Sequence, residues 1–354
     1  MQACLKHGGL LARYSPTLRE IGERSSDSHN RKQQEPKITA DLSGDEKFIS
    51  DCASGKDAYA TLASIAFNMP YEECLEFRPD GTVNKDGKER RSIAKVLVLG
   101  ICYGKSMESI AEDLNVTIDK AEEIYNSVLN AIPGLRHFME ESESQARERG
   151  YVETKWGRKR HIPEMQLAPY EITSSGSKNF DPFFDSIELG VVDDVERLKQ
   201  KYVNDLSSAK YYKQKLAIRE RAEKDGFRIK DNTKLIGDTK RKCVNSRVQG
   251  SAADQTKIAI QNIKNSARLK ELGFKIVLLV HDEIIGECPI ENAIEARNLF
   301  VQCMLDAAKD LRSGAKCDAS ITARWYGKEL DIDNLTVDEI KKEIEKENEE
   351  CLKV

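Results

Sequence analysis

The sequence predicts an α+β fold that combines a small antiparallel sheet with a mostly helical region. Residues 274–289 read FKIVLLVHDEIIGECP, two apolar runs around an acidic tip, which is the pattern of a β-hairpin. Apolar residues recur at helical spacing over 119–148, and a long helix is expected over 241–272. The length of 354 residues is enough for two or three domains, or for one large domain with insertions.

Composition and charge exclude several classes of protein. The formal net charge of −4 argues against a small, wholly basic nucleic-acid binder, but not against a large protein with local basic grooves. No apolar run approaches the roughly 18 residues that a membrane span needs, and the N-terminus lacks the pattern of a secretion signal. The nine cysteines include no CxxC pair, which favours reduced thiols in a cytoplasmic protein without a zinc site.

The N-terminal part predicts an irregular segment followed by helices. Residues 1–34 are polar and show no sustained period of either kind. Residues 38–67 alternate apolar clusters with Ser-Gly and Gly-Lys breaks, which favours short helices. Residues 78–90 form a turn-rich connector with a proline and two Asp-Gly pairs. A helix is expected to begin at about Arg90 and to break near Tyr103.

Helices and hairpins alternate in the rest of the chain. After helices that end at about Gly150, the segment GYVETKWGRKRHIP (150–163) predicts a hairpin with its turn at Trp156-Gly157. The polar stretch 171–240 predicts an inserted helical pair. After the hairpin at 274–289 the expected elements are a helix over 290–312, a strand over 317–325 and a solvated C-terminal helix that begins with a Thr336–Glu339 capping box.

One predicted helix places Arg91, Lys95, Leu99 and Tyr103 at four-residue steps, so that these side chains form a line on one face. Two cations a turn apart, with an aromatic ring beyond them, suit a polyphosphate that carries a planar base. An amphipathic helix with a basic edge would produce the same pattern, so the spacing alone leaves both interpretations open.

The acidic tip of the 274–289 hairpin carries His281, Asp282 and Glu283 between the apolar runs. Adjacent carboxylates at a hairpin tip suit one half of a two-Mg²⁺ phosphoryl-transfer site. An ordinary polar turn is the alternative.

A third motif places Arg241, Asn245 and Gln249 at four-residue steps. An arginine and two amides on one helix face can donate hydrogen bonds to a duplex irrespective of its sequence. The small residues at 250–253 allow another backbone to approach closely. A solvated polar helix face is the alternative.

Together, these motifs resemble those of family A DNA polymerases, the relatives of bacterial DNA polymerase I. The resemblance rests on R-x3-K-x7-YG, on R-x3-N-x3-QG-x-AAD and on VHDE. It implies that Arg91 and Lys95 hold the dNTP triphosphate and that Tyr103 lies at the template base. Leu99 stands where the family usually has an aromatic residue against the nucleotide sugar, an aliphatic variant of phage-type members.

The same resemblance assigns the other motifs. Asp282 would be a metal ligand, Glu283 would assist, and His281 would touch the primer terminus. Arg241, Asn245 and Gln249 would bind primer-template DNA. The GYVET…GR hairpin resembles a family segment, and its basic residues would contact phosphates; these are Lys155, Arg158, Lys159 and Arg160.

This sequence departs from the family at the position of the family's first palm motif. The segment from Gln33 to Lys37, QQEPK, fits phage-type members, so Glu35 would be the residue that excludes ribonucleotides and Gln33 would lie beside the dNTP. Five residues before Glu35, where the family has a metal-binding Asp, stands Asn30; the nearest Asp is Asp27. Asp27 could serve as a catalytic carboxylate and metal ligand only if the residues after it loop out.

The resemblance implies a partial polymerase palm with a mostly helical fingers subdomain, and it covers about residues 33–330. Thumb and exonuclease domains are expected to be absent, or supplied on another chain. The expected organisation is an atypical, disordered or non-family segment over 1–32, the palm-to-fingers start over 33–89, fingers helices over 90–150, a palm/fingers hairpin over 151–170, an inserted helical segment over 171–240, the palm with the VHDE hairpin over 241–330 and a charged C-terminal helix over 331–354.

The function implied is that of a DNA-directed DNA polymerase that uses two Mg²⁺ ions, with primer-template DNA and dNTPs as partners and no membrane. Its location would be the cytoplasm of a bacterial or phage-infected cell. Two alternatives stay open: a catalytically silent remnant that binds DNA or dNTP, or does neither, and one half of a split polymerase.

Overall fold

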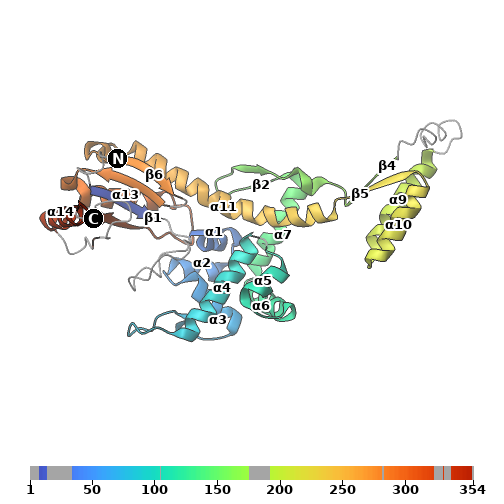
Figure 1. Cartoon of the computed structure of the whole chain (residues 1–354), viewed down its shortest axis with the longest axis horizontal. Coiled ribbons are helices and arrows are strands. Elements are labelled where there is room, and N and C mark those ends of the chain that lie inside the picture. The colour runs from blue at the N-terminus through green and yellow to red at the C-terminus, as the bar shows by residue number, and fades with distance from the viewer. Residues whose placement is uncertain are drawn as a thin grey trace. The chain divides into compact units, whose positions relative to one another are not determined.

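The structure, a computed structural model, describes residues 8–13, 34–103, 105–174, 192–280, 283–322, 330 and 336–352 (Figure 1). The chain divides into two compact units. Unit 1 comprises Met1–Ser144, Val152–Arg160 and Lys242–Val354, and unit 2 comprises Gln145–Tyr151 and His161–Arg241.

The helices and strands confirm the α+β class that the sequence predicts (Figure 1). The helices are α1 (Gln34–Ser43), α2 (Glu46–Ala53), α3 (Ala58–Phe67), α4 (Lys85–Tyr103), α5 (Met107–Leu114), α6 (Ile118–Ala131), α7 (Pro133–Arg149), α9 (Val192–Ser208), α10 (Tyr212–Lys224), α11 (Thr233–Asn265), α12 (Ala267–Glu271), α13 (Ala293–Asp306) and α14 (Val337–Leu352). The strands are β1 (Gly8–Arg13), β2 (Tyr151–Glu153), β3 (Lys159–His161), β4 (Tyr170–Ser174), β5 (Phe227–Asp231), β6 (Lys275–Val280), β7 (Glu283–Cys288) and β8 (Asp318–Thr322).

Unit 1 contains a four-stranded antiparallel sheet in the order β6-β7-β1-β8. Its core includes Ile284 of β7 and Ile321 of β8, packed with Phe300 and Met304 of α13. The register of β1 places Arg13 opposite Glu283 on one side and opposite Asp318 on the other. The sheet therefore brings the start of the VHDE strand β7 beside the end of β1.

A second core in unit 1 is helical. It is built from Phe48 of α2, Leu62 of α3, Leu97 of α4 and Phe138 of α7, and it includes Val248 of α11. This core fixes α4 against the α3 segment, which follows from the apolar face that the sequence predicts for these helices. It positions the helix that carries the Arg91 motif.

Unit 2 has its own small core. Strands β4 and β5 pair antiparallel, and α9 and α10 pack beside them with Tyr202, Leu206, Ile218 and Phe227 buried (Figure 1). Burial and a hydrogen bond to Asp225 raise the pKa of Tyr202 to about 12, so the phenol stays protonated and donates to that carboxylate. The helical pair predicted within 171–240 is present.

The structure differs from the expected elements in several places, of which three follow. Residues 8–13, in the segment expected to be irregular, form β1. Helix α4 begins five residues before Arg90, because the Asn84 side chain accepts a hydrogen bond from the Gly87 amide and caps the earlier start. The long helix expected over 241–272 begins already at Thr233 and is two helices, since Ser266 follows the end of α11 and its hydroxyl accepts from the Leu269 amide to begin α12.

The hairpins and the C-terminal capping box follow the sequence prediction. Strands β6 and β7 pair over the expected range, and β2 and β3 form a two-stranded sheet around Gly157, which has a φ of +79°. The Thr336 amide donates to Glu339 Oε2 at 2.8 Å, and the Glu339 amide donates back to Thr336 Oγ1 at 3.4 Å. In the part of the chain that the structure describes, no helix has the length and apolarity to cross a bilayer.

Cys52 of α2 is expected to resist alkylation in the folded protein. The residue is 1% exposed, and burial raises the pKa of its thiol to about 12, so the reactive thiolate is scarce at pH 8. Iodoacetamide labelling followed by peptide mass spectrometry should show slow modification of Cys52, faster modification of the half-buried Cys317, and full modification of both after unfolding. Equal native rates for the two thiols would contradict this burial.

Candidate nucleotide and nucleic-acid site

Arg91 is held by two carboxylates, one of which lies at the start of α3. Its Nε and Nη2 donate to Asp57 Oδ2 at 3.1 and 2.9 Å, and Nη1 lies 4.0 Å from Glu76 Oε2. The guanidinium also lies over the Tyr59 ring, 5.4 Å from its centroid. Only 15% of the Arg91 side chain is exposed. A triphosphate at this position would therefore have to exchange with, or add to, an existing carboxylate contact.

Asp57 links this ion pair to the helix that follows it. Asp57 is 4% exposed, and its Oδ1 accepts from the Ala60 amide at 2.8 Å, which caps α3. The backbone amide of Asp57 donates to the Tyr71 hydroxyl at 2.8 Å. The Asp57 carboxylate thus accepts from a free backbone amide at the start of α3 and also neutralises the largely buried Arg91.

The other members of the predicted line lie in the same helix. Lys95 is half-buried one turn after Arg91. Leu99 and Tyr103 have helical backbone in α4, and their side chains lie outside the described residues. The four-residue spacing is therefore realised on one continuous helix, as the sequence predicts.

The VHDE hairpin contributes one described carboxylate. Glu283 is the first residue of β7 and is 7% exposed; it pairs in register with Val280 of β6. His281 and Asp282, at the tip, lie outside the described residues. Among the described residues, no three His, Cys, Asp or Glu side chains gather closely enough to hold a metal.

The four-stranded sheet brings a basic residue into register with Glu283. Arg13 ends β1 and is in register with Glu283 and Asp318. Asp27 and Gln33 lie outside the described residues, and Glu35 is buried in the first turn of α1. Glu283 carries the kind of carboxylate oxygens that Mg²⁺ prefers, whereas β1 contributes no acidic residue.

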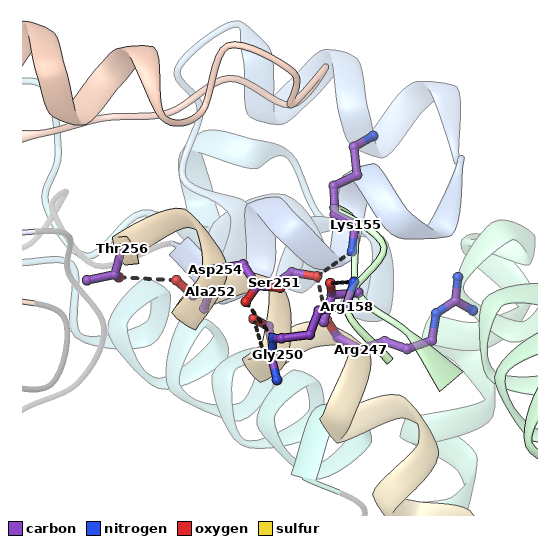
Figure 2. A network of polar contacts seen from close by, with 9 residues as sticks. Lys155, Arg158, Arg247, Gly250, Ser251, Ala252, Asp254 and Thr256 are labelled. Carbon is purple, nitrogen blue, oxygen red and sulfur yellow. Dashed lines mark hydrogen bonds and ion pairs between the residues drawn. The ribbon is translucent and has the colours of Figure 1, made fainter. Parts of the chain in front are cut away.

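A network of polar contacts docks the β2–β3 hairpin on α11 (Figure 2). Arg158 Nε donates to Asp254 Oδ1 at 2.6 Å, and Arg158 Nη2 donates to the Gly250 carbonyl at 2.9 Å. The Lys155 amide donates to Ser251 Oγ at 2.8 Å. A Cβ at position 250 would lie 2.7 Å from Thr154 Cγ2. The small residues of 250–253 thus admit two side chains of the hairpin at Gly250 and the Lys155 backbone amide at Ser251.

Lys155, one of the predicted phosphate contacts, has an internal partner. Its Nζ lies 2.6 Å from Asp41 Oδ2 of α1, a carboxylate that is fully buried. In this structure Lys155 and Arg158 therefore join elements of unit 1, whereas Lys159 and Arg160 are exposed.

Arg247 is the buried cation of this region. Its Nη1 donates to Glu141 Oε2 at 2.8 Å and to Ser142 Oγ at 2.9 Å, and the guanidinium lies 4.7 Å from the Phe138 ring centroid. These contacts join α11 to α7 one turn before Gly250. Arg247 thus fixes the part of α11 on which the hairpin docks.

The three predicted DNA-binding residues of α11 differ in environment. Arg241 forms an ion pair with Asp238 one turn earlier. Asn245 is half-buried and Gln249 is exposed. All three lie in one helix, as the spacing predicts.

Substitutions of Arg158 and Arg160 are expected to have different effects. Arg158 should stabilise the fold, and Arg160 should contact DNA phosphates. Arg158→Ala should lower the free energy of unfolding by about 1 kcal/mol, because it removes a half-exposed ion pair and a carbonyl contact. Arg160→Ala should change stability by less than about 0.5 kcal/mol and lower the salt slope of duplex binding by about 0.9. Urea unfolding measures the stability of each variant, and fluorescence anisotropy of a labelled duplex at several salt concentrations measures the salt slope. If Arg158→Ala lowered the slope and Arg160→Ala lowered the stability, Arg158 would be the phosphate contact.

Three residues important to this site were not predicted from the sequence. Asp57 partners Arg91, Asp254 partners Arg158, and Arg247 anchors α11. A helix-capping Asp before an apolar run was a signal for Asp57, and the Asp of the AAD motif was a signal for Asp254. Neither signal shows which cation the aspartate contacts in the folded chain.

Comparison with protein families gives a match over most of the chain. The model of DNA polymerase family A matches residues 28–180 and 183–327. DNA polymerase I of Lactococcus lactis subsp. lactis (strain IL1403) is 26% identical over 299 residues, 84% of this chain and 26% of that protein. Thermostable DNA polymerase I of Thermus aquaticus is 27% identical over 272 residues, 77% of this chain and 23% of that protein. The chain thus spans about a quarter of the length of these curated relatives.

A solved structure shares the fold. It is the POL domain of Pol1 from M. smegmatis in complex with DNA primer-template and dNTP. The TM-score is 0.58 at 21% identity, and the match covers 90% of this chain and 40% of that one. The likeness shows that the described elements have the architecture of part of such a domain.

Proposed function

The chain belongs to DNA polymerase family A, and from this premise we propose that it is a DNA-directed DNA polymerase that transfers nucleotides from dNTPs to a primer 3′ hydroxyl. The observation that supports the proposal most is that α4 and the β6–β7 hairpin lie in one compact unit. The first carries the cations for a triphosphate, and the second carries the carboxylates of the VHDE tip.

In the proposed reaction, Lys95 and Arg91 neutralise the triphosphate and orient it along α4. Neutralisation makes the α-phosphate easier to attack by the primer hydroxyl and stabilises the pyrophosphate that leaves. Tyr103 would contact the template base, and Leu99 would face the nucleotide sugar. Glu35, in the first turn of α1, would exclude a 2′ hydroxyl.

Primer-template DNA is proposed to contact α11 and the hairpin that docks on it. Gln249 is exposed and Asn245 half-buried, so these amides can reach base or sugar acceptors irrespective of sequence. Lys159 and Arg160 of β3 are exposed and would contact phosphates. Arg241 and His281 are proposed as further DNA contacts.

Mg²⁺ is the proposed cofactor, held by Asp282 with help from Glu283. When bound, divalent ions supply charge neutralisation at the transferred phosphoryl group and activation of the primer hydroxyl. The buried position of Glu283 at the start of β7 favours a fixed orientation for its carboxylate. A further carboxylate is required from outside the described residues, with Asp27 as the proposed source.

A second candidate function is supported by two specific observations. Arg13 stands in register with Glu283, and Arg91 is already paired with Asp57. Both features disfavour assembly of an active site by this chain alone. Both features are compatible with a catalytically silent remnant that binds duplex DNA, and with one half of a split enzyme.

Primer extension distinguishes these candidates. A labelled primer-template is incubated with the chain, Mg²⁺ and four dNTPs, and duplex binding is measured in parallel by anisotropy. Extension supports the polymerase. Duplex binding without extension supports the remnant, and extension that appears only when a thumb-containing fragment of a relative is added supports the split enzyme. Absence of both binding and extension rejects the proposal.

A further inference from the structure

The turn between α9 and α10 in unit 2 exposes two neighbouring aromatic rings. Tyr211 is 68% exposed and Tyr212 is 74% exposed, and Leu216, one turn into α10, is 43% exposed. Both tyrosines lie where the helical pair reverses direction (Figure 1). The exposed parts of these side chains lie outside the buried core of unit 2, and neighbouring exposed apolar groups are a feature of interaction sites.

The turn is held in one conformation. The Gln214 side chain accepts hydrogen bonds through Oε1 from the Lys210 and Tyr211 amides, at 3.1 and 3.2 Å. The Gln214 amide donates to the Tyr211 carbonyl at 3.0 Å. The backbone that presents both rings is therefore ordered by its own contacts, which lowers the entropy cost of binding through them.

The sequence immediately around the rings is basic, between Asp205 and Glu220. Residues 206–219 read LSSAKYYKQKLAIR and contain four basic side chains and no carboxylate. Two of the four have partners, since Lys215 donates to the Tyr170 hydroxyl and Arg219 pairs with Asp231. Lys210 and Lys213 are exposed, and neither has an ion-pair partner among the described residues.

We propose that this turn, Lys210–Lys213, is a binding site for single-stranded nucleic acid, in which Tyr211 and Tyr212 stack on bases and Lys210 and Lys213 contact phosphates. Exposed aromatic rings between cations are the combination by which single strands are bound without sequence preference. A duplex buries its base faces in its own stack, so the two rings favour an unpaired strand. The inference goes beyond the proposed polymerase activity, because binding at this turn requires neither dNTP nor a metal.

The test is anisotropy of a fluorescein-labelled 12-nucleotide oligothymidylate with the full chain. Excess unlabelled blunt duplex occupies any duplex site, and Mg²⁺ and dNTPs are left out, so the result does not depend on catalysis. Tyr211→Ala/Tyr212→Ala is expected to weaken binding at least about fivefold. Tyr211→Phe/Tyr212→Phe keeps both rings and is expected to bind within about twofold of the unchanged chain.

Charge is tested separately. Lys210→Ala/Lys213→Ala should lower the slope of log K against log salt by about 1.4, since each phosphate contact on a single strand contributes about 0.7. Lys224→Ala is the matched control: it is an exposed lysine at the other end of α10, about 18 Å away, and should leave the slope unchanged.

Photo-cross-linking locates the contact directly. A bromodeoxyuridine form of the oligonucleotide should label the peptide that contains Tyr211 and Tyr212. The proposal is overturned if the alanine pair binds as the unchanged chain does, or if the label falls only elsewhere. It is also overturned if the alanine pair changes only the sedimentation mass, which would make the turn a contact between copies of the chain.

Discussion

Replacing Asp57 with alanine is expected to lower the free energy of unfolding by about 4 kcal/mol. The substitution removes the cap of α3, worth about 1 kcal/mol, and leaves Arg91 in a largely buried position without its main partner, which costs about 3 kcal/mol or more. Glu76, 4.0 Å from Arg91, compensates only in part.

Urea unfolding followed by circular dichroism measures this effect. Asp45→Ala is the matched control: Asp45 caps α2 by accepting from the Phe48 amide at 3.0 Å and has no ion-pair partner among the described residues, so a loss of about 1 kcal/mol is expected. Asp57→Asn keeps a capping oxygen but loses the charge, so its loss in the free energy of unfolding should lie between those of Asp57→Ala and Asp45→Ala. Equal losses for Asp57→Ala and Asp45→Ala would show that the Arg91 pair does not stabilise the fold.

Replacing Gly286 with alanine is expected to lower the free energy of unfolding by about 3 kcal/mol, through strain in the four-stranded sheet. A Cβ on β7 at this position would overlap the Phe274 ring and lie 3.0 Å from the Lys275 carbonyl oxygen. Phe274 is 7% exposed and packs against Phe300 with ring centroids 5.1 Å apart, so the ring has little room to move. Overpacking of this kind costs typically about 1–3 kcal/mol.

Gly237→Ala is the control for Gly286→Ala, and the opposite sign is expected. Gly237 lies in α11, and no neighbouring group stands within 4 Å of the place that an alanine methyl group would take, so alanine should stabilise the helix by about 0.5–1 kcal/mol. Phe274→Leu combined with Gly286→Ala should recover part of the loss, because the smaller side chain leaves room for the Cβ. Thermal unfolding of these three variants and the unchanged chain measures the differences, and a neutral Gly286→Ala would contradict the packing of β7 under Phe274.

Local patterns predicted much of the fold. The β6–β7 hairpin follows from two apolar runs around the tip, and α4 follows from a helical period that continues to Tyr103. The Thr336–Glu339 capping box also depends only on neighbouring residues. The break at Ser266 was missed because a serine within an otherwise helical stretch can either continue the helix or cap the next one.

Long-range partners could not be predicted in the same way. Asp57 and Arg91 are 34 positions apart, and Arg158 and Asp254 are 96 apart. Their pairing depends on how helices and hairpins pack, which a periodic pattern does not encode. The resemblance of the hairpin assigns Arg158 to DNA phosphates, and it gives no sign of the contact with Asp254 through which Arg158 docks the hairpin on α11.

Strand β1 shows another limit of prediction from the sequence. GGLLAR has the apolar centre of a short strand, but six residues beside a long polar segment give a weak periodic signal. Its place between β7 and β8 is a tertiary property. The register that sets Arg13 against Glu283 therefore emerged only from the sheet.

Template-directed nucleotide transfer is tested most directly by single-nucleotide incorporation on four primer-templates that differ only in the first template base. With Mg²⁺, the chain is expected to add only the complementary dNTP to each, and Asp282→Ala should lower the rate by a factor on the order of 10³ or more while duplex binding persists. Asp310→Ala, an exposed carboxylate outside the hairpin, should leave the rate unchanged. Incorporation that ignores the template base, or that survives in Asp282→Ala, would contradict the proposed polymerase activity and its assignment to the VHDE hairpin.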